Sequence, residues 1–109
     1  MLGIVPSFLV ETYLPTRRAG ELEQLALRAR RGAQEVTGSG TSVRFVRGVL
    51  VPDDEVCLLQ FEATSSEVVE TVARRAGIQY ERVIEVSETA NVSSEGSNLR
   101  SSRPEGGRP

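Results

Sequence analysis

The stretch VRFVRGVLVPDDEVCLLQFEA, residues 43–63, holds two apolar segments separated by a short polar turn. The segments 42–51 and 55–63 are rich in branched and aromatic residues, which favours β-strands. Pro52, Asp53 and Asp54 between them are typical turn residues, because aspartate side chains bond to the nearby backbone. The stretch therefore predicts an antiparallel hairpin, around which the rest of the fold can be arranged.

One charged residue, Arg47, interrupts the apolar pattern of the first of these strands. The apolar residues on either side of it share one phase: Val43, Phe45, Val49 and Val51. Gly48 follows at once, and glycine inside a strand often marks a bulge that resets the alternation of side chains. We therefore expect a bulge at Gly48 that turns Arg47 away from the core, where Glu11 or Glu62 would pair with it. A buried functional arginine is the alternative.

The segments before the hairpin predict a strand and a helix. Residues 7–14 are rich in aromatic and branched types and lie between two prolines, which predicts a strand. In residues 16–40, leucine, alanine and valine recur at three- and four-residue steps, which predicts an amphipathic helix. Gly38 and Gly40 end this helix, because glycine readily adopts the left-handed cap conformation.

The segments after the hairpin complete the pattern. Residues 65–77 predict a second helix, which Ser65 or Ser66 can cap, and residues 80–88 predict a last strand. The order is strand, helix, strand, strand, helix, strand, with short connections. It predicts a ferredoxin-like α+β fold of the βαββαβ type: a four-stranded antiparallel sheet in the order 4-1-3-2 with both helices on one face.

The sheet face that the helices leave uncovered is called the open face. Alternation along the strands assigns side chains to the two faces. Toward the helices we expect Phe8, Val10, Phe45, Cys57, Leu59, Phe61, Ile84 and Val86. Toward the open face we expect Leu9, Glu11, Tyr13, Leu58, Gln60, Glu62, Val83 and Glu85.

The open face is the candidate binding surface, because it mixes apolar residues with carboxylates on three neighbouring strands. Crowded carboxylates raise one another's pKa or recruit a cation or an arginine. The candidate ligand-binding residues are Glu11, Tyr13, Arg47, Glu62 and Glu85. The alternative is a half-solvated sheet whose cross-strand ion pairs each contribute roughly a few tenths of a kcal/mol.

The composition excludes several classes of function. The chain has 13 basic and 15 acidic residues, a balance that does not fit a polycationic nucleic-acid binder. It has no histidine, which removes the usual general base and the commonest transition-metal ligand. The single cysteine, Cys57, is expected to be a small buried residue, and a metal ligand is the alternative reading of it. Without a secretory signal or a long apolar run, we expect a cytoplasmic protein with no membrane or nucleic-acid partner.

The length of 109 residues predicts one domain. We expect residues 1–6 to be an N-terminal extension and residues 7–88 to be the ferredoxin-like domain. Residues 89–109 are dominated by Ser, Gly, Asn, Pro and Arg and hold too little apolar surface to offset the entropy of ordering. They predict a disordered tail.

Three segments together resemble a family of small bacterial proteins of unknown function: FLVETYLP at 8–15, VCLLQFEATSSEVVETVARRAG at 56–77 and ERVIEVSE at 81–88. That family includes nickel-binding proteins with a ferredoxin-like fold that assemble as dimers. Glu11 and Glu85 match the glutamates of its first and last strands, and Cys57 and Glu62 match residues of its third strand. The resemblance implies the fold and a homodimer. Nickel binding would be expected to use imidazole, which this chain lacks.

These observations favour a non-catalytic, dimeric, ferredoxin-like protein that binds a small molecule of unknown identity. No cofactor is expected, and the absence of histidine argues against nickel. The alternative is a small-molecule enzyme of the dimeric α+β barrel type that works in a cleft between sheet and helices. In that case Glu11 or Glu85 would be the base, and Tyr13 or Arg47 would stabilise the reacting group.

Overall fold

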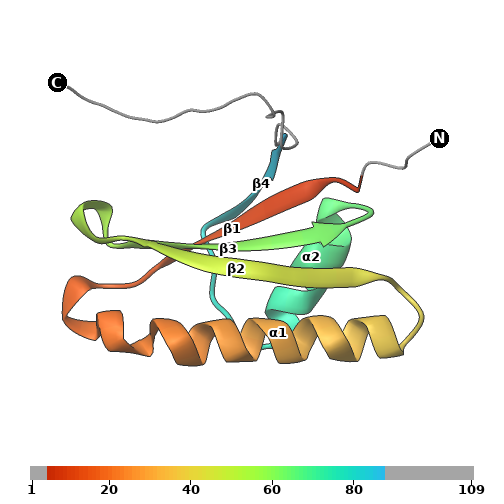
Figure 1. The fold of residues 1–109 in the computed structure, drawn as a ribbon, viewed down its shortest axis with the longest axis horizontal. Coiled ribbons are helices and arrows are strands. Elements are labelled where there is room, and N and C mark those ends of the chain that lie inside the picture. The colour runs from red at the N-terminus through yellow and green to blue at the C-terminus, as the bar shows by residue number, and fades with distance from the viewer. Residues whose placement is uncertain (1–4, 88–109) are drawn as a thin grey trace, which may run out of the picture.

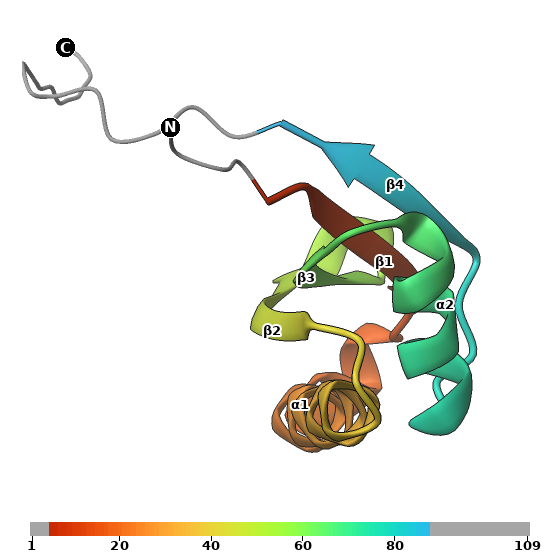
Figure 2. The ribbon, with the colours of Figure 1, turned by 90° about the vertical axis from the view of Figure 1, so that its right-hand side faces the viewer.

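A computed structural model describes residues 5–87 as one sheet packed against two helices (Figure 1). The elements are β1 (Ser7–Tyr13), the 3₁₀ helix η1 (Thr16–Glu21), α1 (Leu22–Gly38), β2 (Val43–Val51), the 3₁₀ turn η2 (Pro52–Asp54), β3 (Val56–Ala63), α2 (Ser66–Arg75) and β4 (Arg82–Val86). Both helices lie on the same side of the sheet (Figure 2). The predicted tail, and residues 1–4 of the predicted extension, lie outside the described residues.

The strands pair in the order β2-β3-β1-β4, and each neighbouring pair is antiparallel. This is the predicted order 4-1-3-2 read from the other edge, so the ferredoxin-like prediction is confirmed. β1 and β3 are central, whereas β2 and β4 form the two edges. The backbone N–H of Ala63 donates to the carbonyl of Pro6 at 3.1 Å, so pairing with β3 begins just before β1.

The single helix predicted over residues 16–40 is in fact two elements. Residues 16–21 form the 3₁₀ helix η1, in which Arg18 departs from helical geometry with φ −111° and ψ 19°. The regular helix α1 starts only at Leu22. Glycine weakens a helix because it loses much backbone freedom, and Gly20 stands at this junction. No helix of the described part has the length and apolar character that a membrane crossing needs.

The second helix has the predicted cap. The Ser65 hydroxyl accepts the backbone N–H of Val68 at 3.4 Å, so Ser65 caps α2 and Ser66 is its first residue. Gly77 follows the helix with φ +70°, a conformation that glycine adopts without steric cost. The helix therefore ends where the sequence predicted.

The core lies between the sheet and the helices. Its buried apolar residues are Phe8, Val10, Leu14, Ala29, Ala33, Val36, Val43, Phe45, Cys57, Leu59, Phe61, Ala63, Val69, Val72, Ala73 and Ile78. The rings of Phe45 and Phe61 meet edge to face with centroids 5.4 Å apart. The helices approach closely at Gly32, where an added Cβ would lie 3.2 Å from the carbonyl oxygen of Val72.

The predicted bulge exists, but it lies at Val46 and not at Gly48. Phe45 pairs with Phe61 and Arg47 with Gln60, so Val46 is the extra residue on β2. Arg47 therefore faces the open side, as do Val49 and Val51, while Val43 and Phe45 face the helices. Gly48 itself faces the helices, because a Cβ there would lie 3.5 Å from Leu22 of α1.

The predicted faces of β4 were wrong. Phe8 pairs with Glu85 and Val10 with Val83, and directly paired residues of antiparallel strands share a face. Val83 and Glu85 therefore lie on the helix face, and Ile84 and Val86 lie on the open face. The strand is short and sits at an edge, so its alternation of types does not reveal which face is buried.

Candidate functional site

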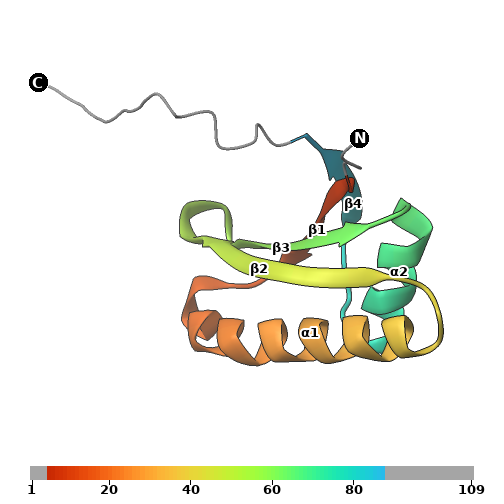
Figure 3. The same ribbon diagram turned by 45° about the vertical axis from the view of Figure 1, so that its right-hand side comes forward.

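The open face of the sheet lies on the side away from the layer of helices (Figure 3). The register of the strands places rows of side chains across it. From β2 to β4 the pairing places them in four rows: Arg44, Glu62, Ser7 and Val86; Arg47, Gln60, Leu9 and Ile84; Val49, Leu58, Glu11 and Arg82; Val51, Val56 and Tyr13. Apolar residues fill two opposite corners of this array, and polar residues fill the other two. No described helix or loop covers this face (Figure 2).

The carboxylates of the open face are held by arginines from the edge strands. Arg44 reaches from β2 to Glu62 with an Nη2–Oε1 distance of 2.9 Å. Arg82 reaches from β4 to Glu11 with an Nε–Oε1 distance of 2.7 Å. These are cross-strand ion pairs, as the second reading of the open face expected, and Glu62 and Glu11 lie in different rows of the array and form no crowded acidic cluster.

Arg47 lies on the open face, but neither predicted carboxylate is its partner. Its Nη1 donates to the side-chain carbonyl of Gln60 at 2.9 Å. Gln60 is only 5% exposed, so this hydrogen bond satisfies the side-chain oxygen of a buried amide. The predicted pairing with Glu11 or Glu62 was therefore wrong, since Arg44 and Arg82 already occupy those two glutamates.

Glu85 is separated from the other candidate ligand residues. It lies on the helix face beside the start of α2, where it lines a shallow hollow with Ser65 and Glu67. Four of the five candidates, namely Glu11, Tyr13, Arg47 and Glu62, do share the open face. They lie in different rows of the array, so they do not converge on one point.

Tyr13 belongs to a junction between β1 and the β2–β3 turn. Its hydroxyl donates to Glu55 Oε1 at 3.4 Å, and the backbone N–H of Thr16 donates to Glu55 Oε2 at 2.9 Å. Glu55 has φ +54°, in the left-handed region that non-glycine residues rarely adopt. The bond from the Thr16 backbone, helped by the hydroxyls of Thr16 and Tyr13, lowers the pKa of the Glu55 carboxyl.

Cys57 is a core residue. Its side chain has no exposed surface, and burial raises the pKa of its thiol to about 11. A thiol at neutral pH is a poor metal ligand, because metals bind the thiolate. In the described part of the chain no three His, Cys, Asp or Glu side chains gather into a group that could hold a metal ion.

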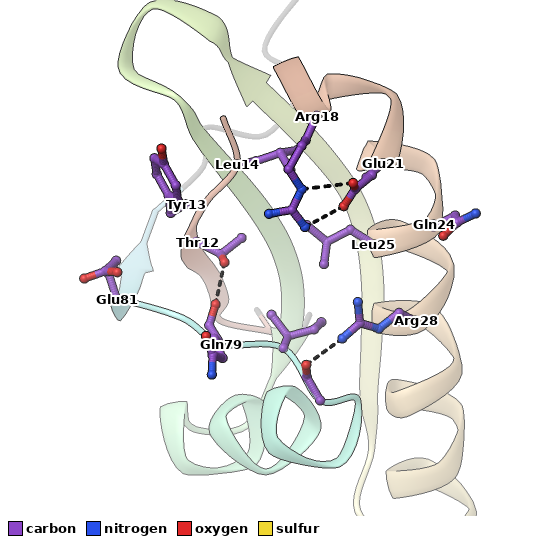
Figure 4. Close-up of a pocket in the computed structure, with 12 residues that line it drawn as sticks. Thr12, Tyr13, Leu14, Arg18, Glu21, Gln24, Leu25, Arg28, Gln79 and Glu81 are labelled. Atoms are coloured by element: carbon purple, nitrogen blue, oxygen red, sulfur yellow. Dashed lines mark hydrogen bonds and ion pairs between the residues drawn. The ribbon is translucent and has the colours of Figure 1, made fainter. Parts of the chain in front are cut away.

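A cleft of about 460 Å³ lies on the helix side, beside the end of the sheet (Figure 4). Its walls are the end of β1, the 3₁₀ helix η1, the first half of α1 and the loop between α2 and β4. The residues lining it are Thr12, Tyr13, Leu14, Arg18, Glu21, Gln24, Leu25, Arg28, Gly77, Ile78, Gln79 and Glu81. The buried Thr12 hydroxyl donates to the backbone carbonyl of Gln79 and so joins two of the walls.

The sequence reasoning missed the arginines that shape both surfaces. Arg44 and Arg82 become partners of the glutamates only through the register of the sheet, which the composition of single strands does not define. Arg18 and Glu21 were detectable, because residues three apart on a helical turn can form an ion pair. Arg28 bonds to carbonyls almost fifty positions away, a contact that no local pattern indicates.

The fold and surfaces define the class of the protein. It is a small ferredoxin-like α+β protein with one uncovered sheet face and a separate polar cleft on the helix side. Residues 8–86 match the model of a family described as nickel responsive protein SCO4226-like, and the chain belongs to this family. The resemblance proposed from the sequence is thereby confirmed.

The solved structures agree with the fold. The crystal structure of SCO4226 from Streptomyces coelicolor A3(2) superposes with a TM-score of 0.58 and 22% sequence identity. The match covers 77% of this chain and 99% of that chain. At this identity the likeness shows the shared fold alone. No curated protein matches the sequence.

Proposed function

We propose that this chain is a non-catalytic binding protein that works as a homodimer, with the open face of the sheet as its pairing surface. The observation that carries the proposal is the diagonal pattern of that face. One apolar corner holds Leu9, Ile84 and Val86, and the opposite corner holds Val49, Val51, Leu58 and Val56. Val49 is 45% exposed, and Tyr13, which lies beside Val56 in the fourth row of the array, is 57% exposed. Exposed apolar residues that are contiguous on a sheet favour a partner.

The pattern fits a second copy of the same chain. A two-fold interface brings the same patch of both subunits together, so that patch must complement itself. If the two-fold axis runs along the diagonal that joins the two apolar corners, the apolar residues of one subunit contact those of the other. Each polar corner then lies opposite the other polar corner of the partner. Glu11 of one subunit would then lie opposite the corner that holds Arg44 and Arg47 of the other. A domain this small also gains stability from a dimer, because it buries only about 60–65% of its unfolded surface alone.

Light scattering tests the pairing. Wild-type protein is expected to give the mass of a dimer, and Leu58→Glu the mass of a monomer, because it would place two carboxylates against each other near the axis. Val49→Glu on the edge strand serves as a second variant in case Leu58→Glu does not fold. Leu27→Glu is the matched control, since Leu27 is 51% exposed on α1, away from this face. A monomeric wild type, or a dimer in all three variants, would overturn the proposal.

The non-catalytic part of the proposal is supported by the state of the candidate bases. The carboxylate of Glu11 is engaged by Arg82 at 2.7 Å, so this oxygen already has a partner within the sheet. Glu85 is exposed on the other face of the sheet, so it cannot act together with Tyr13 or Arg47. The arrangement therefore supports binding better than proton transfer.

The donor set of the described domain does not fit nickel, the metal in the family's description. The chain has no imidazole, and its only thiol is buried among apolar residues with a raised pKa. We therefore propose that this chain takes a ligand other than nickel. Calorimetric titration with Ni²⁺ is expected to give no specific heat for wild type. A stoichiometric signal that disappears in Cys57→Ser would contradict this part of the proposal.

A further inference from the structure

We propose that the cleft beside α1 binds a short linear dicarboxylate between Arg18 and Arg28. This inference goes beyond the pairing of two sheets and does not depend on it, because the cleft lies on the helix side. Its volume of about 460 Å³ is within the range of small-molecule pockets.

Arg18 is anchored so that part of its guanidinium remains available. Its Nε and Nη2 donate to the two carboxylate oxygens of Glu21 at 2.9 and 2.7 Å. The remaining terminal nitrogen, Nη1, points into the cleft on the side of Thr12 (Figure 4). Within residues 5–87 no hydrogen bond engages Nη1. A guanidinium fixed in this way loses little side-chain entropy when it binds an anion.

Arg28 is anchored at the other end of the cleft. Its Nε and Nη2 donate to the carbonyl of Ala76 at 3.2 Å, and Nη2 donates to the carbonyl of Gly77 at 2.5 Å. These carbonyls belong to the end of α2, so the arginine also caps that helix. Its other terminal nitrogen points along the cleft toward Leu25 and Arg18 (Figure 4). Two oriented cationic groups therefore face the same space from opposite ends.

Leu25 lies between the two arginines on α1, with the buried side chains of Leu14 and Ile78 behind it, and the rest of the lining is mainly polar. Two guanidinium groups on either side of a leucine match a ligand with two carboxylates joined by a short methylene chain. Each free guanidinium N–H can donate a charge-assisted hydrogen bond to a carboxylate oxygen.

The acidic residues near the cleft do not oppose this ligand. Glu21 is neutralised by Arg18, which occupies both of its oxygens. Glu81 stands at the rim, and its carboxylate points away from the cleft (Figure 4). The positive charge of Arg28 has only carbonyl partners among the described residues. With the carboxylate of Glu81 pointing outward, the guanidinium of Arg28 remains available to an anion (Figure 4).

Isothermal titration at low ionic strength tests the assignment, with succinate, glutarate and adipate as the dicarboxylates. Butyrate and inorganic phosphate are the comparison anions. At least one dicarboxylate is expected to bind, and Arg18→Gln and Arg28→Gln should each weaken it by about 10- to 100-fold, the effect of a lost charge-assisted hydrogen bond. Arg31→Gln is the matched control, because it removes one charge from an exposed position of α1 outside the cleft. It should change affinity less than about twofold.

Circular dichroism and urea unfolding would confirm that the Arg28 variant is folded, since this residue also caps α2. If Arg28→Gln does not fold, Arg18→Gln decides the matter alone. The assignment would be overturned if no dicarboxylate binds, if phosphate or butyrate binds as tightly, or if Arg31→Gln weakens binding as much as the cleft variants.

Discussion

At the scale of single residues, Glu55 shows how one carboxylate can join two distant turns. It accepts the backbone N–H of Thr16 and the hydroxyl of Tyr13, and its own carbonyl accepts the backbone N–H of Leu14 at 2.8 Å. The β2–β3 turn is thereby tied to the entry of η1. This contact also positions Tyr13 and Leu14 at the end of the cleft.

The first prediction concerns the pH dependence of this contact. Folding lowers the pKa of Glu55, so its contribution to stability is present above the ordinary value of 4.5 and is lost as the pH falls through the folded pKa. Glu55→Gln should therefore be less stable than wild type at neutral pH, and the two should converge as the pH falls below 4.5 and through the lowered pKa of the folded state. Urea unfolding across this range measures the difference. Asp53→Asn, an exposed carboxylate of the same turn, is the control, and a gap that persists at low pH would contradict the assignment.

Arg47 and Glu85 show which features of single residues could and could not be predicted from the sequence. Arg47 was correctly predicted to leave the core, because a charge beside a strand glycine indicates a bulge. Its partner could not be predicted, because Gln60 faces Arg47 only through the register of two strands. Glu85 was assigned to the wrong face, since its strand alternates in type without a strongly buried side.

At the scale of elements, the bulge at Val46 shifts the alternation of β2, so that Phe45 faces the helices and Arg47 faces the open side. The second prediction is that deletion of Val46 preserves the fold at a cost of at most about 2 kcal/mol, because every other residue keeps its pairing partner. Deletion of Leu58 from the unbulged strand β3 should instead unfold the domain, since half of that central strand would turn to the wrong face. Urea unfolding and the dispersion of amide signals measure both outcomes. Loss of the fold in the Val46 deletion would contradict the assignment of Val46 as the extra residue of β2.

The close packing of α1 against the end of α2 requires a residue without a side chain at position 32. A Cβ at Gly32 would meet the carbonyl oxygen of Val72 and the Cβ of Ala76, both at 3.2 Å. The third prediction is that Gly32→Val lowers the free energy of unfolding by about 1–3 kcal/mol, because the helices must separate. Gly38→Val on the same helix has no atom within 4 Å of the new Cβ and should change it by less than about 0.5 kcal/mol. Equal effects of the two variants in urea unfolding would contradict this packing.

The elements themselves were largely predictable. Helical periodicity in α1 and the cap at Ser65 are local signals, and both appear in the structure. The change from 3₁₀ to α geometry at Leu22 was not predicted, because Arg17, Arg18 and Glu21 are good helix formers by composition. Tertiary contacts at the end of β1 override that preference.

At the scale of the whole molecule, the order of elements was enough to predict the fold, because few topologies join six elements with short connections. The surfaces were harder to predict. Of the two readings of the open face, the sheet with cross-strand ion pairs is the one found, but the arginine that pairs with each glutamate was not predicted. The cleft was not foreseen in its detail, since its walls come from four separate parts of the chain.

Two copies of the chain are proposed to meet through the open face, and isotope-filtered NMR detects the intermolecular contacts of such a dimer. A mixed sample of labelled and unlabelled protein should show contacts between the methyl groups of Leu9, Leu58 and Ile84 across the subunits. Leu27, an exposed residue of α1, should show none, because α1 lies on the other side of the sheet from this face (Figure 1). Intermolecular contacts at Leu27, or none at the open face of a protein that light scattering shows to be dimeric, would contradict the account.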